Sequence, residues 1–367
     1  MSAVTPFRID IPDEALTDLQ QRLAHTRWPE AETVADWSQG IPLAYTRELA
    51  DYWARDYDWR SREAALNRFD HFTTELDGLD IHFIHQRSSQ ADAFPLLITH
   101  GWPGSVVEFA EVIEPLTAAG FDVVCPSLPG YGFSGKPVSA GWGIEKIATA
   151  WDALMVRLGY HRYGAQGGDW GSAVTRQIGI DVGHCVAIHT NMPIGRPPEN
   201  LSDPSEQEQR ALAAMAEHQK WGTGYSKQQS TRPQTLGYGL VDSPVAQLAW
   251  IVEKFWAWTD CDGHPENAVD RDTMLDNVML YWLTASGASS ARLYWESFSG
   301  FRTAAKVELP TGVAAFPKEI LRMPRPWCEG SYHITHWTDM PRGGHFAALE
   351  QPDLFVDDVR AFFDTVR

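Results

Sequence analysis

Hydrophobic residues along the chain occur in two kinds of run. Short, mostly apolar runs, of the kind expected for strands buried on both faces, lie at 94–100, 121–129 and 185–191. Apolar residues recur at helical spacing over 144–160, and the segment from Gly104 to about Ala119 is also expected to be helical. Strands that alternate with helices predict an α/β fold with a mostly parallel central sheet and helices on both faces.

The two ends and the middle of the chain depart from this alternation. Residues 1–70 are aromatic and mainly helical in pattern, which predicts an N-terminal helical arm whose apolar face packs on the core. Segment 72–86 predicts a hairpin that turns at Asp77-Gly78. Beyond about 192 the chain becomes Pro-rich and then mainly helical, and strand patterns resume only after about 305. We therefore expect an arm (1–70), an α/β core in two parts (71–191 and 305–367) and an inserted helical lid (192–304).

Composition narrows the class of protein. The chain has 367 residues, 44% of them hydrophobic, and a net charge of −18, which argues against nucleic acid or an anionic membrane as a partner. Its four cysteines form no C-x-x-C pair, so neither a zinc knuckle nor a disulfide framework is indicated. The N-terminus lacks the apolar region of a signal peptide, and no run approaches the ~18 apolar residues of a membrane span. We expect a cytoplasmic protein.

Candidate catalytic residues follow predicted strands, where open α/β sheets place their sites. Asp169 is the centre of GGDWGS (167–172), a strand–turn–helix segment with the small-residue spacing of a nucleophile elbow. Glu319 lies in FPKEI, and His345 lies in RGGHFAALE before the last helix. Each could be an ordinary turn or loop residue by itself. Together they have the nucleophile, acid, base order of an α/β-hydrolase triad.

Further motifs place the chain near a known family. HGWPGS (100–105), GGDWGS, DSPVAQLAWIVEKF, AFPKE and PRGGHFAALEQP resemble blocks of the microsomal-type epoxide hydrolases, as does FRIDIPDEALTDLQQRLAHTRWPE near the N-terminus. The resemblance covers nearly the whole chain and implies the α/β-hydrolase fold. The membrane anchor of the mammalian members is missing, and the lid looks compact. Membrane attachment and substrate preference are therefore not carried over.

The resemblance explains why the elbow presents a carboxylate. Asp169 can open an epoxide and form an ester whose carbonyl carbon water can attack, whereas a serine would leave an ether. The resemblance further implies that Tyr225 and Tyr294 protonate the oxygen of the opened ring, with Tyr281 as the fallback for either. His345 would activate water, oriented by Glu319. No metal or organic cofactor is needed, and the small-molecule partners are the epoxide and water.

The surroundings of the nucleophile can be predicted in part from the fold. By analogy with the fold, the backbone N–H groups of Trp102 and Trp170 form the oxyanion hole, and their side chains wall the substrate pocket. His100 is expected to be structural, because the useful group in its loop is backbone. Ser172, a rival nucleophile, is expected in the first turn of the helix.

Several alternatives remain open. A haloalkane or haloacid dehalogenase uses the same fold and an Asp nucleophile, and an inactive hydrolase fold can serve as a binding module. The tryptophans of the lid suggest a bulky or aryl epoxide, although most of them could simply pack the core. They are Trp221, Trp250, Trp256, Trp258, Trp282 and Trp295. Detoxification and natural-product biosynthesis are both compatible with the sequence, as is a homodimer. The tyrosine pair and HGWPG favour the epoxide hydrolase.

Overall fold

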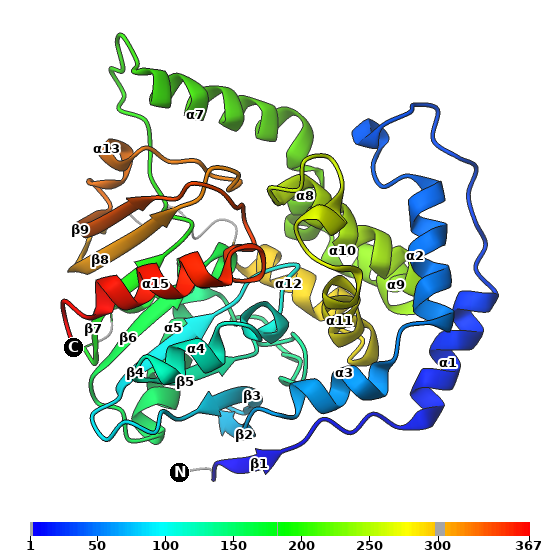
Figure 1. The fold of residues 1–367 in the computed structure, drawn as a ribbon, viewed down its shortest axis with the longest axis horizontal. Coiled ribbons are helices and arrows are strands. Elements are labelled where there is room, and N and C mark those ends of the chain that lie inside the picture. The colour runs from blue at the N-terminus through cyan, green and yellow to red at the C-terminus, as the bar shows by residue number, and fades with distance from the viewer. Residues whose placement is uncertain (1–2, 182, 298–304) are drawn as a thin grey trace.

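The computed structural model describes residues 3–181, 183–297 and 305–367 (Figure 1). Its strands form a nine-stranded sheet in the order β1-β2-β3-β5-β4-β6-β7-β8-β9. The strands are β1 (Thr5–Phe7), β2 (His71–Leu76), β3 (Leu79–Gln86), β4 (Phe94–Thr99), β5 (Phe121–Pro126), β6 (Tyr163–Gly167), β7 (Cys185–Thr190), β8 (Val307–Ala315) and β9 (Tyr332–Asp339). All pairings from β5 through β9 are parallel, whereas β1, β2 and β3 pair antiparallel at one edge. The mostly parallel sheet predicted from the hydrophobic pattern is confirmed.

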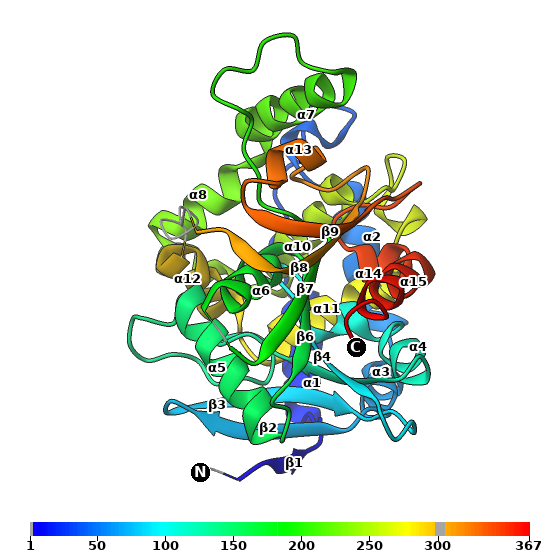
Figure 2. The ribbon, with the colours of Figure 1, turned by 90° about the vertical axis from the view of Figure 1, so that its left-hand side faces the viewer.

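Helices cover both faces of this sheet (Figure 2). Helices α5 (Ile144–Arg157) and α6 (Asp169–Asp181) pack against each other on one face. On the other face lie α4 (Ile113–Ala118), α14 (Ala347–Glu350) and α15 (Pro352–Phe363), and α15 contacts α4, β7 and β8. The side chains of β4, β5 and β6 are almost completely buried between these layers. The carboxyl ends of the parallel strands, where the candidate site residues follow, are thus held by a rigid core.

The hairpin prediction is correct in its register. Leu76 pairs with Leu79, so Asp77 and Gly78 form a two-residue turn between β2 and β3. Both turn residues have positive φ, 49° for Asp77 and 79° for Gly78. A type I′ turn requires that conformation at both positions, and Asp-Gly tolerates it well.

Two predicted segments differ from the structure. The arm contains helices α1 (Asp13–Ala24), α2 (Leu43–Arg55) and α3 (Trp59–Leu66), but it begins with β1, which joins the edge of the sheet. The helix predicted over 104–119 is split into a 3-10 turn, Val106–Phe109, and α4. Pro115 has no N–H to bond to a preceding turn, so it is accommodated in the first turn of a new helix.

A helical insertion lies between β7 and β8. It comprises α7 (Glu206–Glu217), α8 (Gly224–Thr231), α9 (Pro233–Asp242), α10 (Pro244–Trp258), α11 (Arg271–Leu283) and α12 (Gly287–Ser297). A short helix, α13 (Arg325–Cys328), follows β8. The side chain of Ser243 caps α10, and Pro244 is the first residue of this helix. Residues 298–304 of the predicted lid lie outside the described residues, and the predicted limits of arm, core and lid stay predictions.

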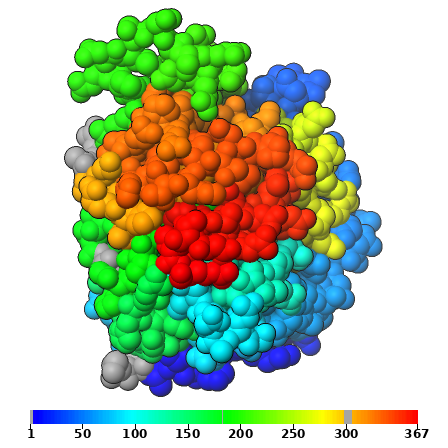
Figure 3. Space-filling view, turned by 60° about the vertical axis from the view of Figure 1, so that its left-hand side comes forward, coloured from blue at the N-terminus to red at the C-terminus, as the bar shows by residue number. Residues whose placement is uncertain are grey.

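The insertion packs on the arm and the core, and even the outlying α7 is attached there, because the Trp327 indole donates to Glu208 over 2.8 Å. In Figure 3 the segment around α7 stands out above β8 and β9. Arg62 on α3 forms an ion pair with Asp276 on α11, and the Tyr57 hydroxyl donates to the same carboxylate over 2.7 Å. Among the described helices, none combines the length and the apolar character needed to cross a membrane.

Candidate active site

Asp169 lies at a sharp turn between β6 and α6. Its φ of 50° is in the left-handed region, which side-chain-bearing residues rarely adopt. The flanking glycines permit the turn: a Cβ on Gly171 would lie 1.9 Å from the Thr99 carbonyl oxygen, and one on Gly167 would lie 2.2 Å from the Gly171 oxygen. Because these neighbours are backbone atoms that cannot move aside, the small residues are a steric requirement of the elbow.

The loop after β4 brings a backbone N–H to the Asp169 carboxylate. The N–H of Trp102 donates to Asp169 Oδ1 over 2.7 Å. This approach needs Gly101, because a Cβ there would lie 2.1 Å from the same oxygen. His100 is structural, as expected: its Nε2 accepts from the Leu128 N–H and its Nδ1 donates to the Gly101 carbonyl. One donor of the predicted oxyanion hole is therefore already bound to the Asp169 carboxylate.

His345 connects the carboxylates of Asp169 and Glu319. Its Nδ1 donates to Glu319 Oε1 over 2.6 Å, and its Nε2 lies 3.5 Å from Asp169 Oδ2. Both members of the His345–Glu319 pair are buried, and Glu319 Oε1 also accepts the N–H of Ile320. Burial alone would lower the pKa of His345, but the nearby Glu319 and Asp169 carboxylates outweigh it and hold that pKa well above the usual range.

Tyr225 on α8 and Tyr294 on α12 meet above the elbow. Their ring centroids are 5.8 Å apart, and the two side chains share a hydrogen bond. Burial, followed by the negative charge of Asp169, raises the pKa of Tyr225 far above its ordinary value. Burial likewise raises the pKa of Tyr294, against a hydrogen bond with the Trp170 side chain. Both phenols are therefore protonated and near a carboxylate.

Aromatic side chains enclose this group. Trp102 stacks on Tyr225 with a centroid distance of 5.1 Å, and Trp170 meets Tyr294 edge to face at 4.8 Å. Trp258, at the end of α10, contacts the Tyr225 ring at 5.0 Å and the His345 ring at 5.1 Å. Sequence reasoning listed Trp258 only among the lid tryptophans. The signal that could have singled out Trp258 is its position in the sequence, four residues after Lys254 and therefore one turn further along the same buried face of α10.

Comparisons with known proteins identify the family. The model of the epoxide hydrolase N terminus matches residues 4–109, and that of the alpha/beta hydrolase fold matches 95–237. A Stigmatella aurantiaca protein, named provisionally as an epoxide hydrolase, is 52% identical over 99% of this chain and 86% of its own length. Epoxide hydrolase 1 of Oryctolagus cuniculus is 35% identical over 99% of this chain and 89% of its own. The chain belongs to the epoxide hydrolase family.

Structural similarity to this family is equally extensive. The structure of Aspergillus niger epoxide hydrolase matches with a TM-score of 0.93 and 37% identity, and the match covers 100% of this chain and 97% of that one. The crystal structure of juvenile hormone epoxide hydrolase from Bombyx mori also has a TM-score of 0.93, at 32% identity and over 100% of this chain and 95% of that chain. The predicted family and the predicted α/β-hydrolase fold are both confirmed.

Other residues considered from the sequence have structural roles in this epoxide hydrolase fold. The Ser172 hydroxyl donates to the Met192 carbonyl over 2.6 Å, inside the first turn of α6 as expected. The Tyr281 hydroxyl donates to the Gly104 carbonyl over 2.8 Å. Two of the tryptophans suggested for the pocket, Trp221 and Trp295, are 75% and 53% exposed. Both indoles are thus largely exposed, and of the two only Trp221 lines the cleft that also contains Glu319 and Trp258.

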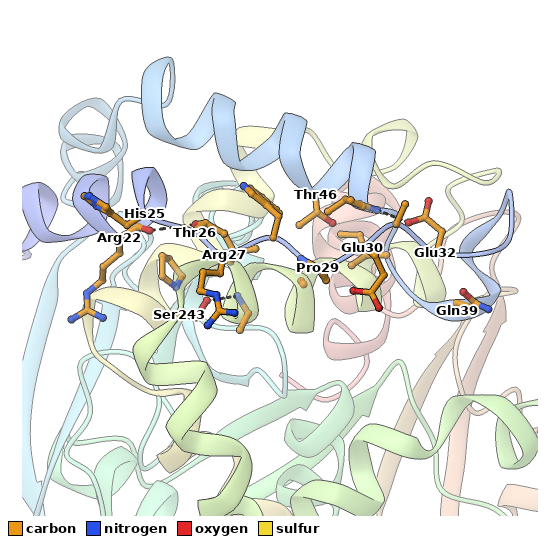
Figure 4. Close-up of a pocket in the computed structure, with 18 of the residues that line it drawn as sticks. Arg22, His25, Thr26, Arg27, Pro29, Glu30, Glu32, Gln39, Thr46 and Ser243 are labelled. Carbon is orange, nitrogen blue, oxygen red and sulfur yellow. Dashed lines mark hydrogen bonds between the residues drawn. The ribbon is translucent and has the colours of Figure 1, made fainter.

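Clefts elsewhere on the molecule are distinct from the Asp169 elbow. A groove of about 980 Å³ lies between the arm and the start of α10, and its lining includes Arg22, Trp28 and Ser243 but none of the predicted site residues (Figure 4). A smaller cleft of about 310 Å³ is lined by Glu319 and Trp258, so it adjoins the candidate site. Among the described residues, no group of three or more His, Cys, Asp or Glu side chains is arranged to hold a metal ion.

Proposed function

We propose that this protein hydrolyses an epoxide to a vicinal diol through an ester formed on Asp169. The observation that carries the proposal is the placement of the Asp169 carboxylate. It lies at a nucleophile elbow between a backbone donor, the N–H of Trp102, and a buried pair of phenols. A phenol pair suits a developing alkoxide, whereas a halide leaving group needs no proton. The same observation therefore disfavours the dehalogenase alternative.

Ring opening assigns different tasks to the two carboxylate oxygens. Oδ1 is held by the Trp102 N–H, so Oδ2 is the oxygen that attacks the epoxide carbon as the C–O bond of the ring breaks. Tyr225 or Tyr294 gives its proton to the released oxygen and becomes a phenolate. Oδ1 then becomes the carbonyl oxygen of the ester and is already placed in the oxyanion hole.

Hydrolysis of the ester uses His345. The imidazole takes a proton from water, and the resulting hydroxide attacks Cγ of Asp169, so that negative charge develops on Oδ1. The Cγ–Oδ2 bond then breaks, and the diol leaves with Oδ2 and the proton from His345. The carboxyl group now contains the oxygen of water, and its remaining proton restores the phenol. Atoms and charges balance without a further reactant.

The aromatic enclosure points to the kind of substrate. Trp102, Trp258 and Tyr225 present ring faces or edges next to the nucleophile. Such surfaces favour flat or apolar substituents, since aromatic pairs gain about 0.5–1.5 kcal/mol beyond the burial of area. We infer that the substrate is an epoxide with an aryl or other bulky apolar substituent.

The experiment that tests the function uses His345→Gln, which lacks the base and should therefore accumulate the ester. The variant is incubated with aryl epoxides and with haloalkanes, and its intact mass is measured. We expect a gain equal to the whole epoxide, located on the Asp169 peptide and absent from Asp169→Asn/His345→Gln. A gain equal to a haloalkane minus its halide would instead identify a dehalogenase. An aryl epoxide turned over by the wild type without any adduct in His345→Gln would refute the ester.

A single turnover in H₂¹⁸O gives an independent check. Because water attacks Cγ and not the substrate carbon, we expect the label in Asp169 and none in the first diol released. Label that appears directly in the diol would mean that water attacks the epoxide, and would refute the covalent route.

A further inference from the structure

Lys254 is a buried cation close to one of the candidate proton donors. It lies on α10 and is 8% exposed, although lysine is among the residues least often buried. Its ammonium nitrogen is 4.8 Å from the centroid of the Tyr225 ring and 5.6 Å from that of Trp258, and it forms an ion pair with Glu253. Burying an ammonium group is costly unless nearby groups compensate, so this placement calls for an explanation.

The surrounding rings account for part of that compensation. Cations are attracted to the faces of aromatic rings within about 6 Å, and the interaction strengthens where water is excluded. Trp250, at 6.0 Å, is a further ring near the ammonium. Cation–ring attraction alone would be satisfied by the tryptophans. Cation–ring attraction does not explain why the ring nearest to the ammonium is that of Tyr225, the phenol that is proposed to lose a proton.

We propose that Lys254 is a positioning residue for ring opening that acts through Tyr225, by stabilising the negative charge which this phenol gains as it protonates the epoxide oxygen. The inference rests on the proposed function. A phenolate spreads its charge into the ring, so an ammonium 4.8 Å from the ring centroid interacts more strongly with the phenolate than with the neutral phenol. Stabilisation that grows toward the transition state accelerates the step.

The other charges around Tyr225 make such a cation useful. Asp169, Glu319 and Glu253 all act on this phenol with negative charge, and each disfavours a phenolate. A hydrogen bond from Tyr294 acts in the opposite direction. Burial and, to a smaller extent, the positive charge of Lys254 lower the pKa of His218. This histidine is therefore also close enough to the ammonium group to be affected by it.

The test isolates ring opening by using His345→Gln as the background, where the ester should be trapped. Alkylation of Asp169 by styrene oxide is followed by rapid quench and intact mass, over a range of epoxide concentrations and from pH 6 to 9. Lys254→Met removes the charge and keeps a chain of similar length. Lys254→Arg keeps a cation that can lie over the ring. Glu253→Gln removes the acidic neighbour of the ammonium but leaves the ammonium.

The three variants have distinct expected results. We expect Lys254→Met to slow the maximal alkylation rate about tenfold, with little change in the half-saturating epoxide concentration. Lys254→Arg should retain the rate within about threefold, and Glu253→Gln should increase it about two- to threefold. If Lys254 had only a structural role, removal of its charge and removal of the charge of Glu253 would not change the alkylation rate in opposite directions.

The results that would overturn the role of Lys254 differ from the result that would refute the proposed function. Any one of three results would overturn the inference. Lys254→Met could alkylate as fast as the His345→Gln background does, Lys254→Met and Lys254→Arg could lose rate equally, or Glu253→Gln could slow alkylation. Circular dichroism and thermal unfolding check that the variants fold. Glu253 is partly exposed, so Glu253→Gln decides the question if Lys254→Met does not fold. Absence of an adduct in the His345→Gln background, when the wild type does turn over styrene oxide, would refute the proposed function instead.

Discussion

Replacement of Glu319 by Gln should affect the two steps of the proposed reaction, alkylation of Asp169 and hydrolysis of the ester, to very different extents. The carboxylate contacts His345 alone among the proposed catalytic side chains, through Oε1 and Nδ1 at 2.6 Å. During ester hydrolysis His345 becomes an imidazolium and needs this negative charge. During ring opening it transfers no proton. We therefore expect Glu319→Gln to slow hydrolysis of the ester and to leave alkylation within about threefold of the wild type.

The size of the effect follows from the distance. Two unit charges 2.6 Å apart interact by about 6 kcal/mol at an effective dielectric constant of about 20. A glutamine oxygen can still accept the Nδ1 hydrogen bond, and neutral hydrogen bonds are roughly half as strong as charge-assisted ones. A loss of about 3 kcal/mol remains, which corresponds to a decrease of about 10²-fold in the hydrolysis rate.

The assay compares formation and decay of the ester by rapid quench and intact mass. The ratio of the ester decay rate to the ester formation rate should fall about 10²-fold, so the ester fraction at steady state should rise. Glu308→Gln, the same substitution at an exposed position of β8, serves as the matched control and should behave as the wild type. Hydrolysis within threefold of the wild type in folded Glu319→Gln, or equal losses in both half-reactions, would refute the role of Glu319.

Other predictions concern the proton donors, the elbow and acid stability. Tyr225→Phe and Tyr294→Phe should each slow alkylation about 10- to 100-fold, and the double variant should lose more than either; unchanged single-turnover rates would exclude them as donors. Gly101→Ala should lower activity at least about 100-fold, because the added Cβ would lie 2.1 Å from Asp169 Oδ1. Gly239→Ala on α9 is the control: its Cβ would enter open space, so this variant should be active and stabilised by up to about 1 kcal/mol. Burial would raise the pKa of Asp358, but hydrogen bonds from buried His189, from Thr338 and from partly exposed His336 hold that pKa at about 2. The contribution of Asp358 to stability, about 2 kcal/mol, is therefore present above pH ~4 and lost as the pH falls toward 2. Urea unfolding of Asp358→Asn should differ from that of the wild type at pH 6 and converge with it near pH 2.

The candidate triad could be predicted from the sequence because local rules determine where its residues lie. Asp169 directly follows β6, and its glycine neighbours are required by backbone contacts within the same turn. Glu319 and His345 follow β8 and β9, whose carboxyl ends lie at the same edge of the sheet as that of β6. Residues that follow neighbouring parallel strands are brought together by the sheet itself.

The surroundings of the triad could not be predicted in the same way. Trp258 and Lys254 lie on α10, and only the packing of that helix decides which of its side chains face Tyr225. A buried lysine has no signal in a hydrophobic pattern. β1 was also missed, because three residues that include Pro6 are too short a run to show the alternation of a strand. Its partner β2, which is distant in the chain, determines that it forms.

The charges around His345 also explain the order of the proposed half-reactions. Burial lowers the pKa of His345, but the charge of Glu319 and, while Asp169 is ionised, the charge of Asp169 outweigh it, so these carboxylates favour the protonated imidazole. A protonated imidazole cannot activate water, so little base is present before the nucleophile has reacted. Esterification neutralises Asp169 and removes its share of that stabilisation, which lowers the pKa of His345. The imidazolium then gives its proton to water of the solvent and becomes the base, and it takes a proton back when hydrolysis restores the Asp169 carboxylate. In the proposed mechanism the same carboxylate thus serves as nucleophile and as the charge that delays hydrolysis of its own ester.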